Sequence, residues 1–166
     1  MKGTLTDPLI NVRVADEVWI ATALLHRENP KRDDFTVKEI VDRARAENIT
    51  GALRAGVDDH VRYHAVANKE PQPVQLRMLY ETSKGRRRLY REGDPAHPKR
   101  KGKIVPAADA IPARYRQLLD WYRNEYAGPR KDDWLRGLKE LDGAGKEVFA
   151  GIDPDEYVRR LREGWD

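Results

Sequence analysis

The order of regular segments along the chain is the feature that most restricts its fold. Two short runs, QLRMLYE (75–81) and RRRLYRE (86–92), flank the turn-forming segment TSKG and predict a β-hairpin. Three segments with helical spacing of apolar residues precede this hairpin, at 14–28, 35–48 and 52–68. The chain therefore begins with three predicted helices and continues into a pair of strands.

Local signals support the helical predictions. Thr36, followed three residues later by Glu39, forms a capping box at the start of 35–48. In 52–68, the residues Leu53, Val57 and Val61 recur every four positions and predict one buried stripe. Gly56 lowers the intrinsic helix propensity of that segment by about 1 kcal/mol.

A fourth helix is predicted over 111–126, where a proline stands near the first turn. The segment AGPRKDD (127–133) that follows contains Gly, Pro and a run of charges, and is typical of a domain boundary. The buried stripe of this helix is expected to consist of aromatic and aliphatic residues: Tyr115, Leu118, Leu119 and Tyr122.

The predicted fold class is α+β, mainly α with a small β-hairpin. Three helices followed by a hairpin is the order of a winged helix–turn–helix domain. We expect this head to span 1–127, with its core at 14–92 and 111–126 as an added helix. A helical, largely extended tail is expected over 128–166.

The charges of the chain are unevenly distributed. The net charge is +4, yet residues 54–103 contain 13 Lys/Arg and 6 Asp/Glu, whereas 132–166 contain 6 Lys/Arg and 10 Asp/Glu. The basic middle region suits a polyanion, and in a helix–turn–helix the second helix enters the major groove of DNA. The predicted contacts to double-stranded DNA are Arg54, Arg62, Tyr63, Lys69, Lys84, Arg86, Arg87 and Arg88.

Two alternatives to DNA binding stay open. The winged domain could serve a protein partner alone, or its Lys and Arg residues could form an ordinary solvated surface. Asp58 and Asp59, on the same predicted helix, would repel phosphate. A further basic segment, Lys99 to Lys103, extends the same positively charged region.

Few residues suggest catalysis or metal binding. His60 and His64 are four residues apart, a spacing that can bind zinc, but the chain has no cysteine and no HExxH motif. Histidines at the edge of the core, or in contact with DNA, are the favoured interpretation. No nucleophile elbow, P-loop or GxGxxG segment is present, so we expect no enzyme, no catalytic residues, no metal and no cofactor.

The tail contains two short amphipathic segments. One places Trp134, Leu135, Leu138 and Leu141 on one helical face. The other begins with Asp153 as N-cap and presents an apolar stripe that ends at Trp165. Helices this short are marginal alone in water, so their apolar faces need a surface. That surface is either the head itself or a separate protein.

The stretch LKELDGAGKEVFAGIDPDEYVRRLREGWD resembles the C-terminal toxin-binding tail of VapB-type antitoxins. The matching positions are Leu138, Gly143, Gly145, Lys146, Phe149, Asp155, Glu156, Tyr157, Val158, Leu161, Arg162 and Trp165. The resemblance implies a PIN-domain ribonuclease toxin as partner, with one of Arg159, Arg160 and Arg162 reaching its magnesium-binding acidic site. With Trp134 of the first amphipathic segment added, the expected toxin-binding residues are Trp134, Leu138, Phe149, Tyr157, Val158, Arg159, Leu161, Arg162 and Trp165.

The head departs from the family pattern, because about 130 residues of winged-helix character replace the usual small DNA-binding module. We therefore expect an antitoxin of a type II toxin–antitoxin system, whose head binds operator DNA for autoregulation. The alternative is a stand-alone winged-helix regulator, or a defence-system interaction module, with the tail packed on its own head. A homodimer would match the two-fold symmetry that operators usually have. Binding of the toxin would produce a toxin–antitoxin hetero-oligomer.

The cellular location is expected to be the cytoplasm. The absence of cysteine fits a reducing compartment, and no apolar run approaches the roughly 18 residues needed to span a membrane. The first residues, MKGTLTDPLI, have no long apolar region of the kind a signal peptide carries. We therefore expect no membrane partner.

Overall fold

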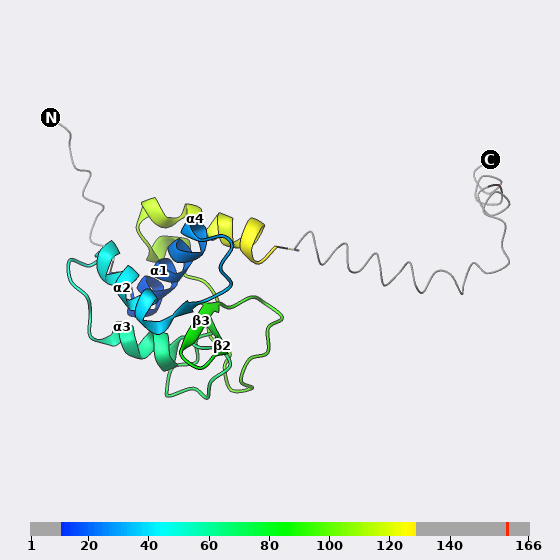
Figure 1. The fold of residues 1–166 in the computed structure, drawn as a ribbon, viewed down its shortest axis with the longest axis horizontal. Helices are drawn as coiled ribbons and strands as arrows, with labels where there is room; N and C mark the ends of the chain where they lie inside the picture. Colours follow the sequence, from blue (N-terminus) through cyan, green and yellow to red (C-terminus); the bar gives the residue numbers. More distant parts are fainter. Residues whose placement is uncertain (1–10, 129–158, 160–166) are drawn as a thin grey trace. The chain divides into compact units, whose positions relative to one another are not determined.

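The computed structural model describes residues 11–128 and Arg159 (Figure 1). The chain divides into two units, Met1–Gly128 and Pro129–Asp166. The first unit is of the α+β class, with helices and a small antiparallel sheet. Its elements, in chain order, are α1 (Val14–Glu28), β1 (Phe35–Thr36), α2 (Val37–Glu47), α3 (Gly56–Asp59), the π-helical turn η1 (His60–His64), β2 (Leu79–Ser83), β3 (Arg86–Leu89), the 3-10 turns η2 (Ala108–Ala110) and η3 (Ala113–Tyr115), α4 (Gln117–Trp121) and the π-helical turn η4 (Tyr122–Tyr126).

Helix α1 is the centre of this unit, and α2, α3, η1, β3 and α4 all contact it (Figure 1). The predicted bounds of this helix, 14–28, are confirmed. Its apolar residues, among them Trp19, are buried on several sides, as expected for a helix enclosed by others. Asp16 and Glu17 are also buried, at the end of the helix where the macrodipole favours negative charge.

The capping box predicted for α2 is confirmed. The backbone N–H of Glu39 donates to Thr36 Oγ1 at 3.2 Å, and the backbone N–H of Thr36 donates to Glu39 Oε2 at 2.8 Å. The helix begins at Val37, directly after the predicted N-cap Thr36. Phe35 and Thr36 instead form strand β1, a two-residue element that the sequence analysis missed.

The predicted helix over 52–68 is shorter in the structure. Regular turns run from Gly56 to His64, and the last of them is π-helical. Val57 and Val61 are buried as predicted. After His64 the chain leaves the helix because the carbonyl of Ala65 accepts hydrogen bonds from the N–H groups of Met78 and Leu79, at 3.0 and 2.8 Å. Pairing with the strand region thus replaces the last predicted turn of helix, residues 65–68.

The predicted hairpin is confirmed, with shifted strands and a third strand added. All pairs are antiparallel, and the order β1-β3-β2 places β3 at the centre. Leu79 pairs with Leu89, and a bulge interrupts the register between Glu81 and Ser83. The turn falls at Lys84–Gly85, where Gly85 has φ +78, a conformation suited to glycine.

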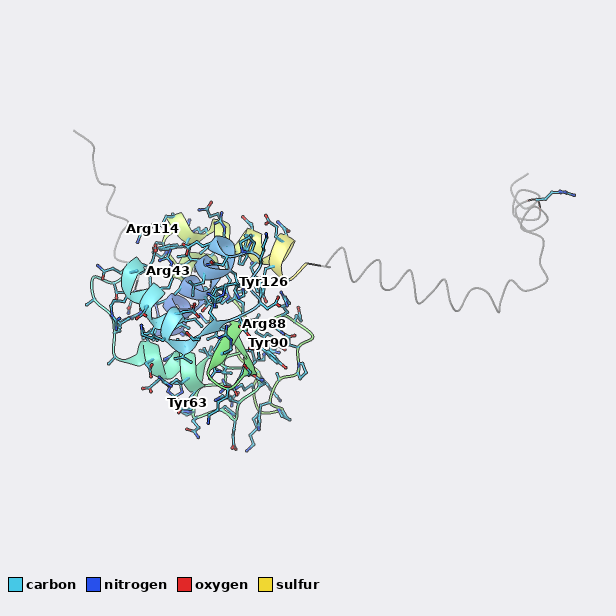
Figure 2. All side chains as sticks on the ribbon, in the orientation of Figure 1. Arg43, Tyr63, Arg88, Tyr90, Arg114 and Tyr126 are labelled. Atoms are coloured by element: carbon cyan, nitrogen blue, oxygen red, sulfur yellow. The ribbon has the colours of Figure 1, made fainter. Side chains whose placement is uncertain are left out.

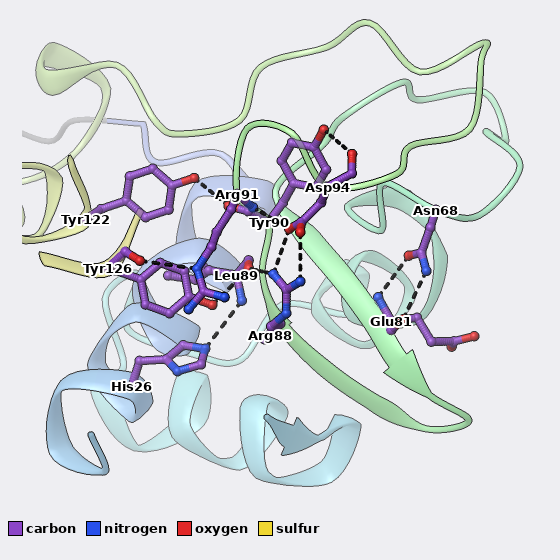
Figure 3. Close-up of polar contacts among 10 residues, drawn as sticks. All are labelled: His26, Asn68, Glu81, Arg88, Leu89, Tyr90, Arg91, Asp94, Tyr122 and Tyr126. Carbon is purple, nitrogen blue, oxygen red and sulfur yellow. Dashed lines mark hydrogen bonds and ion pairs between the residues drawn. The ribbon is translucent and has the colours of Figure 1, made fainter. Parts of the chain in front are cut away.

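The predicted helix over 111–126 is broken into η3, α4 and η4. Its predicted stripe is nevertheless buried, and the rings of Trp19 and Tyr122 meet edge-on with centroids 5.8 Å apart. The hydroxyl of Tyr122 donates to the Tyr90 carbonyl, and that of Tyr126 donates to the Leu89 carbonyl at 3.0 Å (Figure 3). This segment therefore belongs to the same core as the sheet.

None of the helices in the described ranges is long and apolar enough to cross a membrane. The helical tail predicted over 128–166 lies outside the described residues, apart from Gly128 and Arg159.

Candidate nucleic-acid interface

The outward side of α3 and η1 presents four polar or aromatic side chains, which we call the helix surface: Asp58, Asp59, Arg62 and Tyr63. Val57 and Val61 set this orientation, because their burial turns the opposite side of the helix away from the core. Tyr63 is 48% exposed, and no other large hydrophobic residue in the described part of the chain is as exposed. Figure 2 places it at the rim of the first unit.

Two charged pairs border Tyr63. Arg62 Nε donates to Asp58 Oδ2 at 2.5 Å, one helical turn earlier. Lys69 Nζ lies 5.4 Å from the centroid of the Tyr63 ring and 3.1 Å from Glu81 Oε2. Both cations therefore remain at the surface, each with a carboxylate beside it.

Arg54 lies two residues before α3, and its side chain faces α1. Its Nε and Nη2 both donate to Glu17 Oε2, at 3.0 and 2.7 Å, and Glu17 is buried. A guanidinium that holds a buried carboxylate is costly to remove. Arg54 is therefore a core-side partner of α1 in this structure.

Arg87 is enclosed within the fold. Its side chain is 3% exposed, and it forms an ion pair of 2.5 Å with Glu81 Oε2. Its Nε donates to the Val61 carbonyl at 3.1 Å, and its Nη2 donates to the Arg62 carbonyl at 3.3 Å. Burial lowers the pKa of Arg87. Because it is buried and bonded to these carbonyls, the side chain joins the hairpin to η1 and is not presented to a partner.

The other two hairpin arginines are paired as well. Arg86 Nε and Nη2 each lie 2.7 Å from Asp34 Oδ1, in the loop before β1. Arg88 binds both oxygens of Asp94, at 2.7 and 2.9 Å, and lies over the Tyr80 ring (Figure 3 shows the carboxylate contact). Lys84, at the hairpin turn, is exposed and has no carboxylate within ion-pair distance among the described residues.

The structure thus separates the eight predicted DNA contacts into two groups. Four remain at the surface, on the helix surface, beside it or at the hairpin turn: Arg62, Tyr63, Lys69 and Lys84. The other four are arginines that use two or more nitrogens on acceptors within the fold, whereas Arg62 and Lys69 each use one. These four are Arg54, Arg86, Arg87 and Arg88.

The sequence analysis missed the role of Arg100, which it included in the basic segment Lys99 to Lys103. Arg100 is buried, and its guanidinium donates to backbone carbonyls at the end of η1 and in the loop that follows. The shortest of these bonds reach Lys69 at 2.6 Å, Tyr63 at 2.8 Å and Leu76 at 2.8 Å. A cation among the last carbonyls of a helix is favoured by the macrodipole. No sequence signal distinguishes Arg100 from its exposed neighbours Lys99 and Lys101.

A cleft of about 520 Å³ opens beside this loop. Three prolines form much of its lining, and Lys99 and Lys101 add positive charge. The lining residues are Pro71, Pro73, Gln75, Pro98, Lys99 and Lys101. Lys103, further along the same segment, is instead directed inward and binds the buried Asp16 at 2.6 Å.

The two histidines singled out for their zinc-like spacing form a pair at the edge of the core. The ring centroids of His60 and His64 are 5.0 Å apart, and His60 Nδ1 lies 2.8 Å from the Gly56 carbonyl. Burial lowers the pKa of His60. Within the described ranges, no group of three or more potential metal ligands comes together.

A buried histidine outside the predicted site supports the base of the hairpin. His26 Nε2 accepts a hydrogen bond from the Leu89 N–H at 3.3 Å (Figure 3). The His26 ring packs edge-on against Phe35 and tilted against Tyr126. Burial, assisted by the charges of Arg91 and Arg88, lowers the pKa of His26 to about 4. The imidazole is therefore neutral at physiological pH.

Of the residues predicted to bind a toxin, the structure describes Arg159, which is helical and exposed. The others lie outside the described residues: Trp134, Leu138, Phe149, Tyr157, Val158, Leu161, Arg162 and Trp165.

No protein-family model, curated protein or solved structure matches the chain.

Proposed function

We propose that the first unit is a winged-helix DNA-binding head. The observation that carries this proposal is the element order α1-β1-α2-α3-β2-β3 together with the strand order β1-β3-β2. In a winged helix, the second and third helices form the helix–turn–helix and the last two strands form the wing. Here these parts correspond to α2, to α3 with η1, and to β2 with β3.

The proposed DNA surface combines the exposed part of the helix surface with the hairpin turn. Arg62 and Tyr63 would meet the major groove, while Lys69 and Lys84 would contact phosphates on either side. The four arginines that hold carboxylates within the fold are left out of this surface. The proposed interface is thus smaller than the sequence suggests, and its affinity for DNA should depend on few phosphate contacts.

We also propose that the whole chain is an antitoxin of a type II toxin–antitoxin system, active in the cytoplasm. Its tail would bind and neutralise a PIN-domain ribonuclease, and its head would bind operator DNA to repress its own operon. The support for the toxin is the resemblance of residues 138–165 to the toxin-binding tails of VapB-type antitoxins. The head and the tail need only be joined in one chain, because the proposed DNA-binding site uses no residues of the tail and the proposed toxin-binding site uses none of the head. We propose no catalytic role for the chain.

Affinity capture from the native host tests the antitoxin proposal. The tagged full chain is compared with a matched chain that ends at Arg130, which keeps every described residue of the head. We expect the full chain, and not the shorter one, to retain a small ribonuclease and to inhibit its activity. Capture of the same partners by both chains, or of no ribonuclease by either, would contradict the proposal.

One observation favours a second candidate, a module that binds protein alone. Most of the arginines predicted to contact phosphates are neutralised within the fold, and the most exposed large hydrophobic side chain described, Tyr63, is of the kind enriched at protein interfaces. In that case the head binds no duplex at any salt concentration, and Tyr63→Ala weakens binding to a protein partner. Salt-dependent duplex binding would exclude this candidate.

A further inference from the structure

We propose that Arg62, held in place by Asp58, is the side chain with which the head distinguishes guanine from the other bases of the major groove. This inference rests on the proposed DNA-binding function and adds the base that the helix surface recognises. Asp58 is a positioning residue in this account, because it acts on DNA through Arg62.

The first argument is the availability of donors. Arg62 uses its Nε for Asp58, and neither of its terminal amino groups makes a hydrogen bond to another described residue. The other arginines predicted to contact DNA use terminal nitrogens for acceptors within the fold. Arg54 uses Nε and Nη2 for Glu17, and Arg86 uses the same two groups for Asp34. Arg88 uses both Nη1 and Nη2 for Asp94.

The second argument is the match of geometry to one base. Guanine presents two neighbouring acceptors, O6 and N7, to the major groove, and the paired terminal N–H groups of an arginine bind both at once. Adenine offers a donor where guanine offers O6, so it repels one of the two donors. With Nε occupied by Asp58, end-on binding through Nη1 and Nη2 is the mode left to Arg62.

The third argument is position. Val57 and Val61 face the core, and Arg62 and Asp58 each follow one of them by a single residue. Both polar side chains therefore lie outside the buried stripe, and their ion pair places them one above the other along the helix axis. Their side chains are 49% and 48% exposed, which leaves room for a base edge.

The fourth argument concerns the acidic partner. An exposed ion pair four residues apart contributes little to helix stability, and a carboxylate near DNA repels phosphates. Asp58 does, however, restrict the rotamers of a long side chain, so less conformational entropy is lost when Arg62 binds a base. The Arg62–Asp58 pair thus lowers the affinity for DNA of any sequence and raises the specificity for one base.

Selection from a random duplex library tests the proposal with the full chain and three variants. For the wild type, we expect one position of the selected sites to be enriched in guanine. Arg62→Lys keeps the charge but not the two parallel donors, so the preference for guanine at that position should fall about tenfold. Asp58→Asn should weaken the same preference while total affinity for DNA stays level or rises. Lys84→Ala should lower affinity for all sequences alike and keep the preference.

Retention of the guanine preference in Arg62→Lys, or its full persistence in Asp58→Asn, would overturn the proposal while leaving DNA binding intact. Failure of the wild type to retain any duplex would overturn both the inference and the DNA-binding function on which it rests. Circular dichroism at the assay temperature checks that each variant is folded, which is expected because all three side chains are exposed or half exposed.

Discussion

Arg87 and Val61 connect the hairpin to the helix that carries the proposed DNA surface. The guanidinium Nε of Arg87, on the central strand, donates to the backbone carbonyl of Val61 at 3.1 Å. The same side chain binds Glu81 on β2, so one residue joins η1 to both strands of the hairpin. The middle arginine of the triplet is therefore part of the core, although its sequence context suggests a surface.

We expect Arg87→Ala to lower the free energy of unfolding by about 3 kcal/mol, because it removes one partner of a buried ion pair and leaves carbonyls without donors. Urea denaturation followed by circular dichroism measures this change. Lys84→Ala, in the same hairpin, is the matched control and should stay within about 0.5 kcal/mol of the wild type. Equal stability of the two variants would show that Arg87 is not the connection described.

The stability of the head should decrease as the pH falls from 7 to 5. The pKa of His26 is lowered from 6.5 to about 4 on folding, so the unfolded chain takes up a proton in a range where the folded protein does not. The contribution of neutral His26 to the free energy of unfolding is therefore present above pH 6.5 and is lost as the pH falls toward 4. Between pH 7 and 5 the free energy of unfolding should decrease by about 2 kcal/mol. His26→Gln keeps an acceptor for Leu89 and should flatten this dependence. An unchanged slope in urea titrations of that variant would assign the effect to other groups.

Tyr122→Phe should lower the free energy of unfolding by about 1–2 kcal/mol, because the Tyr90 carbonyl loses its donor inside the core. Tyr63→Phe removes an exposed hydroxyl and provides a control of the same chemistry. Thermal unfolding of both variants tests whether the segment 111–126 belongs to the head. If Tyr122→Phe unfolds at the temperature of the control, this segment contributes less than its contacts suggest.

Thr36→Ala should destabilise the head by about 1 kcal/mol through loss of the capping box, whereas Thr36→Ser retains the hydroxyl that accepts from Glu39. Differential scanning calorimetry of the pair measures the difference. Similar unfolding temperatures for the alanine and serine variants would contradict the assigned cap.

Much of the fold follows from local sequence signals. The capping box at Thr36 and the spacing of Val57 and Val61 are properties of a few adjacent residues, and the structure confirms them. Strand β1 could not be predicted, because two residues carry no periodicity and their pairing partner, β3, lies about fifty residues away. For the same reason, the helix predicted over 52–68 was extended too far toward its C-terminal end. In the structure, Ala65 leaves the helix and pairs with a distant strand region.

The sequence was sufficient to place basic residues on the helix and the hairpin, but it did not show which of them stay exposed. Sequence places positive charge on the helix and hairpin but does not show which carboxylates lie opposite. Asp34 and Asp94 neutralise Arg86 and Arg88 through contacts that depend on the tertiary fold. Arg62 differs because its partner, Asp58, is one turn away on the same helix and can be recognised from spacing alone.

The binding of double-stranded DNA to the full chain, measured by fluorescence anisotropy over a series of salt concentrations, tests the central claim most directly. We predict that the logarithm of the binding constant falls linearly with the logarithm of salt concentration, because each phosphate contact releases counterions. Lys84→Ala should reduce the magnitude of that slope by about 1. Absence of salt-dependent binding by the wild-type chain, or the same slope for wild type and Lys84→Ala, would contradict a DNA-binding head that uses the helix surface and the hairpin turn.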